Sequence, residues 1–204
     1  MVSWYQWVAL GALAYCLGSL LYHLVKIIRL GKPVDLARPA GTESAGIRYS
    51  FTQGMSPLKK ESAYLHLPTY AAGLFYHGGT FLSILVFLLS LGGLAFPSGL
   101  RWIVAGIVVL TSLAGLFILI KRVALPKMRS LSNPDDYLSN LLVTGFQGMT
   151  VAFLLIGAEA GCPYYLVATL LLLYMPLGKL RHLLYFFAAR YQLGLFFGRR
   201  GVWR

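Results

Sequence analysis

Five apolar stretches of the chain are each long enough to cross a lipid bilayer as a helix. A hydrocarbon core of about 30 Å needs roughly 20 apolar residues in helical form. Spanning strands would instead be about 10 residues long and would alternate in polarity. The pattern therefore predicts an all-α integral membrane protein, a five-transmembrane-helix bundle formed by a single domain over 1–204. The predicted helices cover 4–28, 70–96, 102–120, 138–160 and 163–187.

The basic residues are divided unequally between the polar segments that join these helices. Seven Lys and Arg residues lie in 26–60, four in 121–129 and six in 179–204. Arg101 alone lies in the remaining connections. Because cytoplasmic loops carry such an excess, we expect the N-terminus outside and the C-terminus in the cytoplasm of a multi-pass protein of the cell (inner) membrane.

The composition excludes two broad classes of protein. Charged residues make up 12% of the chain and hydrophobic residues 58%, whereas a soluble domain carries about 25% charge. We attribute the formal charge of +12 to the basic residues of the cytoplasmic segments, which would also attract anionic lipid. It therefore does not indicate nucleic-acid binding. Cys16 and Cys162 form no CxxC motif, so the sequence does not favour covalent heme attachment or a cysteine-ligated cluster, and we expect any iron–sulfur group to belong to another chain.

The longest polar segment, 29–67, is predicted to be a cytoplasmic loop. Pro, Gly and Ser interrupt it, yet it carries Tyr49, Phe51 and Tyr64, which a solvated linker would not need. We interpret it as a docking loop for a soluble partner, since long loops in compact proteins are often functional. The alternative is a loop that packs on its own bundle or lies among the lipid headgroups. The tail 188–204 mixes aromatic residues with arginines and is either an interfacial anchor or a second contact for a partner.

Two histidines are predicted to face each other in the cytoplasmic half of the membrane. His77 lies inside the second predicted helix and His182 near the cytoplasmic end of the fifth, which runs in the opposite direction. Two imidazoles on separate helices can serve as the heme iron axial ligands of a b-type heme. The alternative is a histidine hydrogen-bonded to another helix, although ionisable residues in a membrane are functional by default.

Small and basic residues beside these histidines fit the same hypothesis. A flat macrocycle needs clearance from the backbone, which glycines near each histidine can give, although glycine also serves plain helix packing. Lysine and arginine near the surface can pair with heme propionates. The residues predicted for heme packing and propionates are Gly73, Gly78, Gly79, Gly178, Lys179 and Arg181.

The other polar residues near the membrane have less specific interpretations. His23, Lys26 and His66 are candidates for hydrogen bonding a quinone carbonyl or relaying a proton. Simple interfacial residues, or a second heme on His23 and His66, remain alternatives. Glu159 is either a solvated helix end or a point of proton entry.

The motif "LFYHGG" in the second predicted helix and the run "PLGKLRHLLYFFAARYQL" in the fifth resemble the gamma subunit of respiratory nitrate reductase, a membrane cytochrome b. The resemblance implies that His77 and His182 bind the heme on the cytoplasmic side. It also implies a second, outer heme, but Phe87, Tyr164 and Tyr165 lie where its ligands would be. We therefore expect that heme to be missing and quinone to react in the cytoplasmic half.

The loop "SAGIRYSFTQGMSPLKKESAYLH" is similar to cytochrome b modules of heterodisulfide-reductase-type and quinone-interacting oxidoreductase complexes. Those modules pair with cytoplasmic iron–sulfur subunits, some of which also contain flavin. Together the two resemblances imply a membrane-anchor cytochrome b subunit that passes electrons between an iron–sulfur partner and the (mena)quinone pool. The alternatives are a heme-free membrane anchor for a redox enzyme and a small transporter, although the chain has no inverted repeat.

Overall fold

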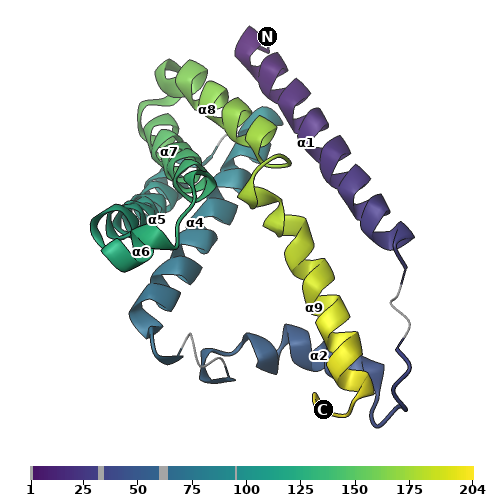
Figure 1. The fold of residues 1–204 in the computed structure, drawn as a ribbon. Coiled ribbons are helices and arrows are strands. Elements are labelled where there is room, and N and C mark those ends of the chain that lie inside the picture. Colours follow the sequence, from purple (N-terminus) through teal and green to yellow (C-terminus); the bar gives the residue numbers. More distant parts are fainter. Residues whose placement is uncertain (1, 32–34, 60–63, 95) are drawn as a thin grey trace. The chain divides into compact units, whose positions relative to one another are not determined.

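The computed structural model describes residues 2–31, 35–59, 64–94 and 96–204. Helices make up 83% of the chain, and the described residues contain no strand. The chain divides into two compact units, Met1–Gly18 with Pro68–Leu180, and Ser19–Leu67 with Arg181–Arg204. The α-helices, labelled in Figure 1, are α1 (Trp4–Arg29), α2 (Glu43–Phe51), α4 (Leu67–Leu91), α5 (Ser98–Ala124), α6 (Pro126–Ser130), α7 (Pro134–Ile156), α8 (Gly161–Tyr174) and α9 (His182–Arg199). The short 3-10 helices are η1 (Gln53–Met55), η2 (Pro57–Lys59), η3 (Gly157–Ala160) and η4 (Lys179–Arg181).

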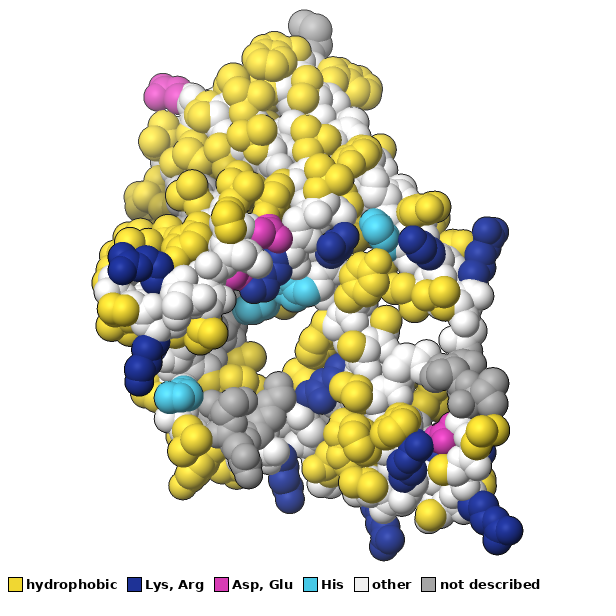
Figure 2. All heavy atoms as spheres, viewed as in Figure 1, with side chains coloured by type: hydrophobic (Ala, Val, Ile, Leu, Met, Phe, Trp, Pro, Cys, Tyr) yellow, Lys and Arg dark blue, Asp and Glu magenta, His cyan; other side chains and the backbone are white. Residues whose placement is uncertain are grey.

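Among the described residues, four helical stretches are long and apolar enough to cross a membrane: α1, α4, α5 and the run Pro134–Tyr174 that joins α7, η3 and α8. Hydrophobic side chains cover much of the molecular surface in Figure 2, and most of the large ones on these helices are exposed. Such a surface is stable in lipid and would be costly in water. The prediction of an all-helical, multi-pass membrane protein is confirmed at this level.

The helices of the first unit alternate in direction. Contacts between α4 and α5 pair Gly79 with Thr111 and Thr69 with Lys121, so these two helices are antiparallel. The α7 and α8 helices are also antiparallel, since the rings of Phe153 and Tyr164 stack 4.5 Å apart while Ser139 lies 3.4 Å from Tyr174 (Oγ to Oη) at the other end.

The N-terminal helix runs parallel to α8. Gln6 donates to the Tyr165 hydroxyl near the start of both helices, at 3.4 Å, and the Cys16 thiol lies 3.7 Å from the Met175 sulfur near their other ends. Thr111 of α5 donates to Gln147 of α7 at 2.9 Å, and Val104 packs with Leu154, so α5 and α7 are antiparallel. Helices α1, α5 and α8 therefore run one way, and α4 and α7 the other.

A buried polar network holds α4, α5 and α7 together. The Gln147 side chain is fully buried and donates to the Tyr76 carbonyl at 3.2 Å and to the Thr80 hydroxyl at 2.9 Å, while accepting from Thr111. The Tyr76 hydroxyl lies 2.9 Å from that of Thr144. Polar contacts of this kind and small residues are the main attachments between membrane helices.

The second and fifth predicted helices end earlier than the sequence pattern indicated. Helix α4 stops at Leu91 and not at 96, because Gly93 adopts a left-handed φ of +76° and the Leu94 amide turns back to the Leu89 carbonyl at 3.0 Å. Glycine adopts this conformation without strain and commonly ends helices. Residue 95 of the predicted helix lies outside the described residues.

The predicted helix 163–187 is interrupted, which corrects the sequence interpretation. Helix α8 ends at Tyr174, and η4 and α9 follow only after a turn at 175–178. Pro176 lacks an amide hydrogen and its ring clashes with the preceding turn, so it cannot continue a helix. The histidine at 182 consequently begins α9 and does not continue α8.

The second unit brings the predicted loop and tail together. Residues 29–67 contain α2, η1 and η2, and the tail is helical as far as Arg199. A Cβ atom on Gly46 would overlap the backbone of Gly194 and Gly198, so α2 and α9 pack backbone against backbone. Residues 32–34 and 60–63 of the predicted docking loop lie outside the described residues.

Side chains lock this helix pair at several points. The buried Ser50 hydroxyl donates to the Arg190 carbonyl at 2.8 Å, and the Arg190 guanidinium donates to the Gly54 carbonyl at 2.8 Å. Tyr49 packs on Trp203 with ring centroids 5.3 Å apart, and Phe51 stacks on Phe187 at 6.4 Å. Two of the aromatic residues expected to contact a partner thus pack on the chain's own tail.

An ion pair fixes the end of the tail to the segment before α2. Arg200 donates two hydrogen bonds to the Asp35 carboxylate, at 2.6 and 3.1 Å. The Ala37 amide, which donates to this carboxylate at 3.0 Å, and the Arg200 charge together hold the pKa of Asp35 below its ordinary value. The pair is therefore intact at neutral pH and is lost only as the pH falls through that lowered pKa.

Candidate functional site

His77, the first predicted heme ligand, lies on the exposed side of α4 in the first unit. Its Nδ1 atom is 2.7 Å from the Gly73 carbonyl oxygen, one turn earlier in the helix. A carbonyl can only accept, so Nδ1 carries the hydrogen and the neutral ring has its lone pair on Nε2. Metal-binding histidines commonly donate their other ring hydrogen to a backbone carbonyl, so this side chain has the tautomer that an iron ligand requires.

His182, the second predicted ligand, is the first residue of α9 in the second unit. It follows the 3-10 turn η4, whose last residue is Arg181. Both His182 and the predicted propionate partner Arg181 are exposed within their own unit. The described part of the chain contains no cluster of three metal-ligating side chains. A bis-histidine heme needs only two protein ligands, so this finding does not test the heme hypothesis.

The four glycines predicted to make room for a heme have two kinds of surroundings. A Cβ atom on Gly73 or Gly78 would meet nothing within 4 Å, so the α4 backbone is open on both sides of His77. A Cβ on Gly79 would overlap the Thr111 side chain of α5, and one on Gly178 would overlap the Tyr174 ring. The backbone beside Gly73 and Gly78 is therefore open, whereas Gly79 and Gly178 accommodate side chains of this chain.

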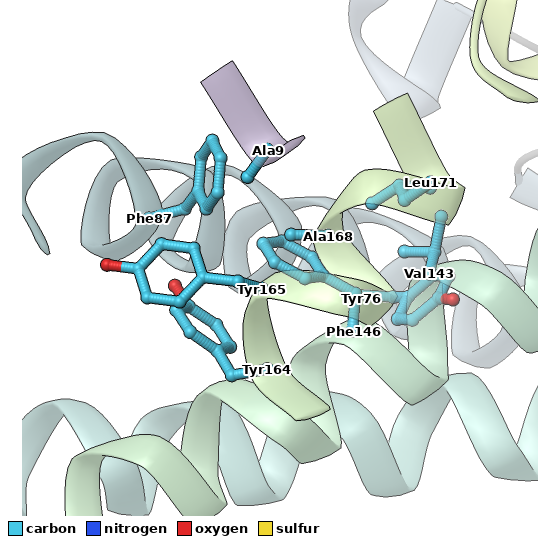
Figure 3. Packing of buried hydrophobic residues seen from close by; sticks show 9 residues of the cluster. All are labelled: Ala9, Tyr76, Phe87, Val143, Phe146, Tyr164, Tyr165, Ala168 and Leu171. Atoms are coloured by element: carbon cyan, nitrogen blue, oxygen red, sulfur yellow. The ribbon is translucent and has the colours of Figure 1, made fainter. Parts of the chain in front are cut away.

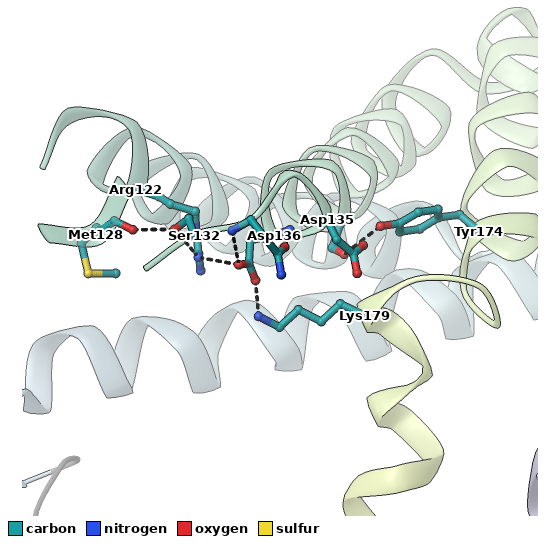
Figure 4. A network of polar contacts seen from close by, with 9 residues as sticks. Arg122, Met128, Ser132, Asp135, Asp136, Tyr174 and Lys179 are labelled. Carbon is teal, nitrogen blue, oxygen red and sulfur yellow. Dashed lines mark hydrogen bonds and ion pairs between the residues drawn. The ribbon is translucent and has the colours of Figure 1, made fainter. Parts of the chain in front are cut away.

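Lys179, predicted to bind a propionate, forms an ion pair with the buried Asp136 at the start of α7 (Figure 4). Arg122 lies 3.6 Å from the same carboxylate (Nη1 to Oδ2) and donates to the Ser132 hydroxyl at 2.9 Å. Asp136 also closes the capping box that begins α7 with Asn133. The carboxylate therefore ties the end of α5 and the start of η4 to the start of α7, and the Lys179 ammonium has an anionic partner in the chain itself.

Aromatic rings fill the space between α4, α7 and α8 at the level where the outer heme ligands would lie. Phe87, Phe146, Tyr164 and Tyr165 are all buried there (Figure 3). The Phe87 ring lies 6.3 Å from that of Tyr164 and 6.0 Å from that of Tyr165, centroid to centroid. Such packing is close to the density of a protein core, so these side chains occupy this part of the first unit themselves.

His23 has a partner that the sequence did not indicate. Its Nδ1 atom lies 3.0 Å from the hydroxyl of Tyr185 on α9, within the second unit. Tyr185 belongs to the quoted run of α9 residues, but nothing in the spacing could pair it with a histidine 162 residues away. Lys26 is exposed in the last turn of α1 and His66 is exposed just before α4, and the structure brings neither one to this pair.

Comparisons with protein-family models, with curated proteins and with solved structures give no match.

Proposed function

We propose that this chain is a membrane-anchor cytochrome b subunit of a respiratory oxidoreductase. It would carry one b heme on His77 and His182 and pass electrons between a cytoplasmic iron–sulfur partner and the quinone pool. The heme would transfer single electrons between the iron–sulfur partner and the quinone. The chain itself would provide the ligands, the membrane anchor and a contact surface for the partner.

The observation that carries the proposal is the geometry of His77. Its Nδ1 hydrogen is committed to the Gly73 carbonyl, which directs the Nε2 lone pair away from the helix backbone. Gly73 and Gly78 leave the neighbouring backbone open for a flat ring. A histidine that only formed a hydrogen bond to a neighbouring helix would not need open space beside the backbone on both sides.

The alternating helix directions support the proposed topology. Five membrane crossings follow if the chain reverses at η3, where Gly157 has a φ of +82° and α7 and α8 pack as an antiparallel pair. With the N-terminus outside, the ends that carry Lys121, Arg122 and Lys179 then lie on the cytoplasmic side, in agreement with the positive-inside rule. A heme near that side would be within reach of a cytoplasmic redox partner.

The filled aromatic core supports one heme rather than two. A second heme beside Phe87 would require several buried rings to leave a packed site, and large changes in core volume are costly. A single heme near the cytoplasmic side makes quinone chemistry in the same half of the membrane the simplest arrangement.

A pyridine hemochrome assay on the purified, detergent-solubilised chain with its native partner subunits tests the proposal. One b heme per chain is expected, after correction for hemes in other subunits. His77→Ala and His182→Ala should each abolish the bis-histidine spectrum and quinone-linked activity while the chain stays inserted in the membrane. His66→Ala, an exposed histidine just before α4, is the matched control and should keep the wild-type spectrum.

Other outcomes would reject parts of the proposal. Two hemes would mean that a ligand pair was missed, with His23 and His66 the first residues to test. A full bis-histidine spectrum in either alanine variant would overturn the ligand assignment. No heme would leave the alternative of a heme-free membrane anchor, in which the Lys179–Asp136 pair and the contact of Gly79 with Thr111 are purely structural.

A further inference from the structure

The hydrogen bond between His23 and Tyr185 has no evident structural necessity. The two rings meet edge to face with centroids 5.9 Å apart, and the Tyr22 ring lies 5.8 Å away from His23 in a similar orientation. The imidazole is half-buried and the Tyr185 side chain is 37% exposed. The pair therefore presents polar atoms at an accessible surface and does not fill a core.

On both helices, the residues next to His23 and Tyr185 in the sequence are apolar. Leu24 and Val25 follow His23 on α1, while Leu183 and Phe186 flank Tyr185 on α9, and each is at least 36% exposed. A polar pair in such a neighbourhood lies beside an exposed apolar surface, which a flat apolar ligand could contact. Polar and ionisable groups are costly there, and those that occur are commonly functional.

We propose that His23 and Tyr185 together bind one carbonyl group of a membrane quinone and that His23 carries the proton for it. This inference rests on the proposed function, because it takes quinone as the substrate. A quinone is a flat apolar ring with two carbonyl acceptors, and it reaches a protein through the lipid. The pair offers an O–H donor, an imidazole and an aromatic surface on the apolar flank of two adjacent helices.

The proton balance at this carbonyl is simple. On reduction, an O–H bond forms at the quinone oxygen as an N–H bond of the protonated His23 ring breaks, and the ring then regains a proton from water. The second carbonyl takes the other proton, and the two electrons come from the iron–sulfur partner. Oxidation of the quinol is the same sequence in reverse, with the partner as the electron acceptor.

Tyr185→Phe tests the binding half of the inference, because it removes only the hydroxyl. The probe is 2-heptyl-4-hydroxyquinoline N-oxide, a quinone analogue, titrated by fluorescence quenching against the full complex in nanodiscs. Loss of one hydrogen bond to the ligand should raise the dissociation constant roughly five- to tenfold. Tyr191→Phe is the matched control on the same helix, with a similar exposure of 41%, and should bind the probe as the wild type does.

His23→Gln tests the proton-carrying half. Glutamine keeps a polar side chain for Tyr185 but cannot carry a proton at neutral pH. The probe should bind within about twofold of the wild type, whereas kcat for quinol oxidation should fall about a hundredfold or more, the usual contribution of a general base. An unchanged kcat, or equal losses in kcat and in probe binding, would overturn the proton-carrying role.

Failure of the inference can be told from failure of the proposed function. If heme is present and Tyr185→Phe binds the probe like Tyr191→Phe, the quinone site is wrong while the cytochrome assignment stands. If the chain holds no heme but probe binding still depends on Tyr185, the site is correct and the cytochrome assignment is wrong.

Discussion

At the scale of single residues, glycine has two different roles in this chain. Gly73 and Gly78 leave open space beside a candidate heme ligand, whereas Gly115 brings α5 against Tyr76 and Thr144. Sequence alone cannot separate these roles, because a glycine in a membrane helix serves either purpose. The neighbours across the helix interface decide between them.

A pair of substitutions on α5 tests this distinction. Gly115→Ala should destabilise the chain by about 1–3 kcal/mol, since the added methyl group would overlap the Tyr76 ring and the Thr144 hydroxyl in a packed core. Gly106→Ala, where a Cβ meets nothing within 4 Å, should be neutral or slightly stabilising. Thermal unfolding in detergent gives both values, and equal melting temperatures for the two variants would contradict the packing role.

The candidate site could be predicted from sequence only in part. His77 stands out because a histidine within an apolar helix is uncommon. The hydrogen bond of its ring to Gly73 could be anticipated from their spacing of four residues. The partners of Lys179 and His23 could not, because Asp136 and Tyr185 are distant in sequence and only the tertiary fold brings them close.

At the scale of elements, the segment expected to be a loop contains the helix α2 and the 3-10 turns η1 and η2. The periodicity of apolar residues in α2 is weak, and its sequence resembles a turn-rich linker. Packing against α9 stabilises it as a helix, because Gly194 and Gly198 of α9 leave room for the Gly46 backbone. Tertiary packing commonly overrides local propensity for short helices of this kind.

Gly46→Leu should release α2 from α9. The added side chain would meet backbone atoms of Gly194 and Gly198, which cannot rotate away as a flexible side chain could. We expect trypsin to cleave after Arg48 about tenfold faster or more, since local opening of an element exposes its backbone to proteases. Ser44→Leu, at an exposed position of the same helix, is the control and should be cleaved like the wild type.

The break in the last predicted helix was recoverable from the sequence. Pro176 and Gly178 both disfavour a continuing helix, but the apolar residues before them, in 163–175, and those after His182, in 183–187, outweighed that signal in the pattern. The bounds of α1, by contrast, differ from the predicted span by one residue, and α5 extends four residues beyond its predicted span at each end, because long apolar runs specify a helix strongly.

At the scale of the whole molecule, the proposed topology rests on the distribution of charge and on the alternating directions of the helices. A C-terminal green fluorescent protein fusion should fluoresce, and alkaline phosphatase fused at the same site should be inactive. Phosphatase fused at η3 should be active, because that turn is proposed to face outside, whereas a fusion after Ala124 should behave like the C-terminal one. Active phosphatase at the C-terminus would reverse the proposed orientation.

The turn at 175–178 has a consequence for the membrane in which the chain can work. Helix α8 has 14 residues, or about 21 Å at the usual rise per residue, which is shorter than an average hydrocarbon core. The amides of Met175, Leu177 and Gly178 donate to the carbonyls of Leu171 and Tyr174 in the last turn of α8, and Pro176 has no amide hydrogen to satisfy. The turn can therefore enter the hydrocarbon core at little cost and compensate for the short length of α8. The position of the segment before His182 should then depend on bilayer thickness.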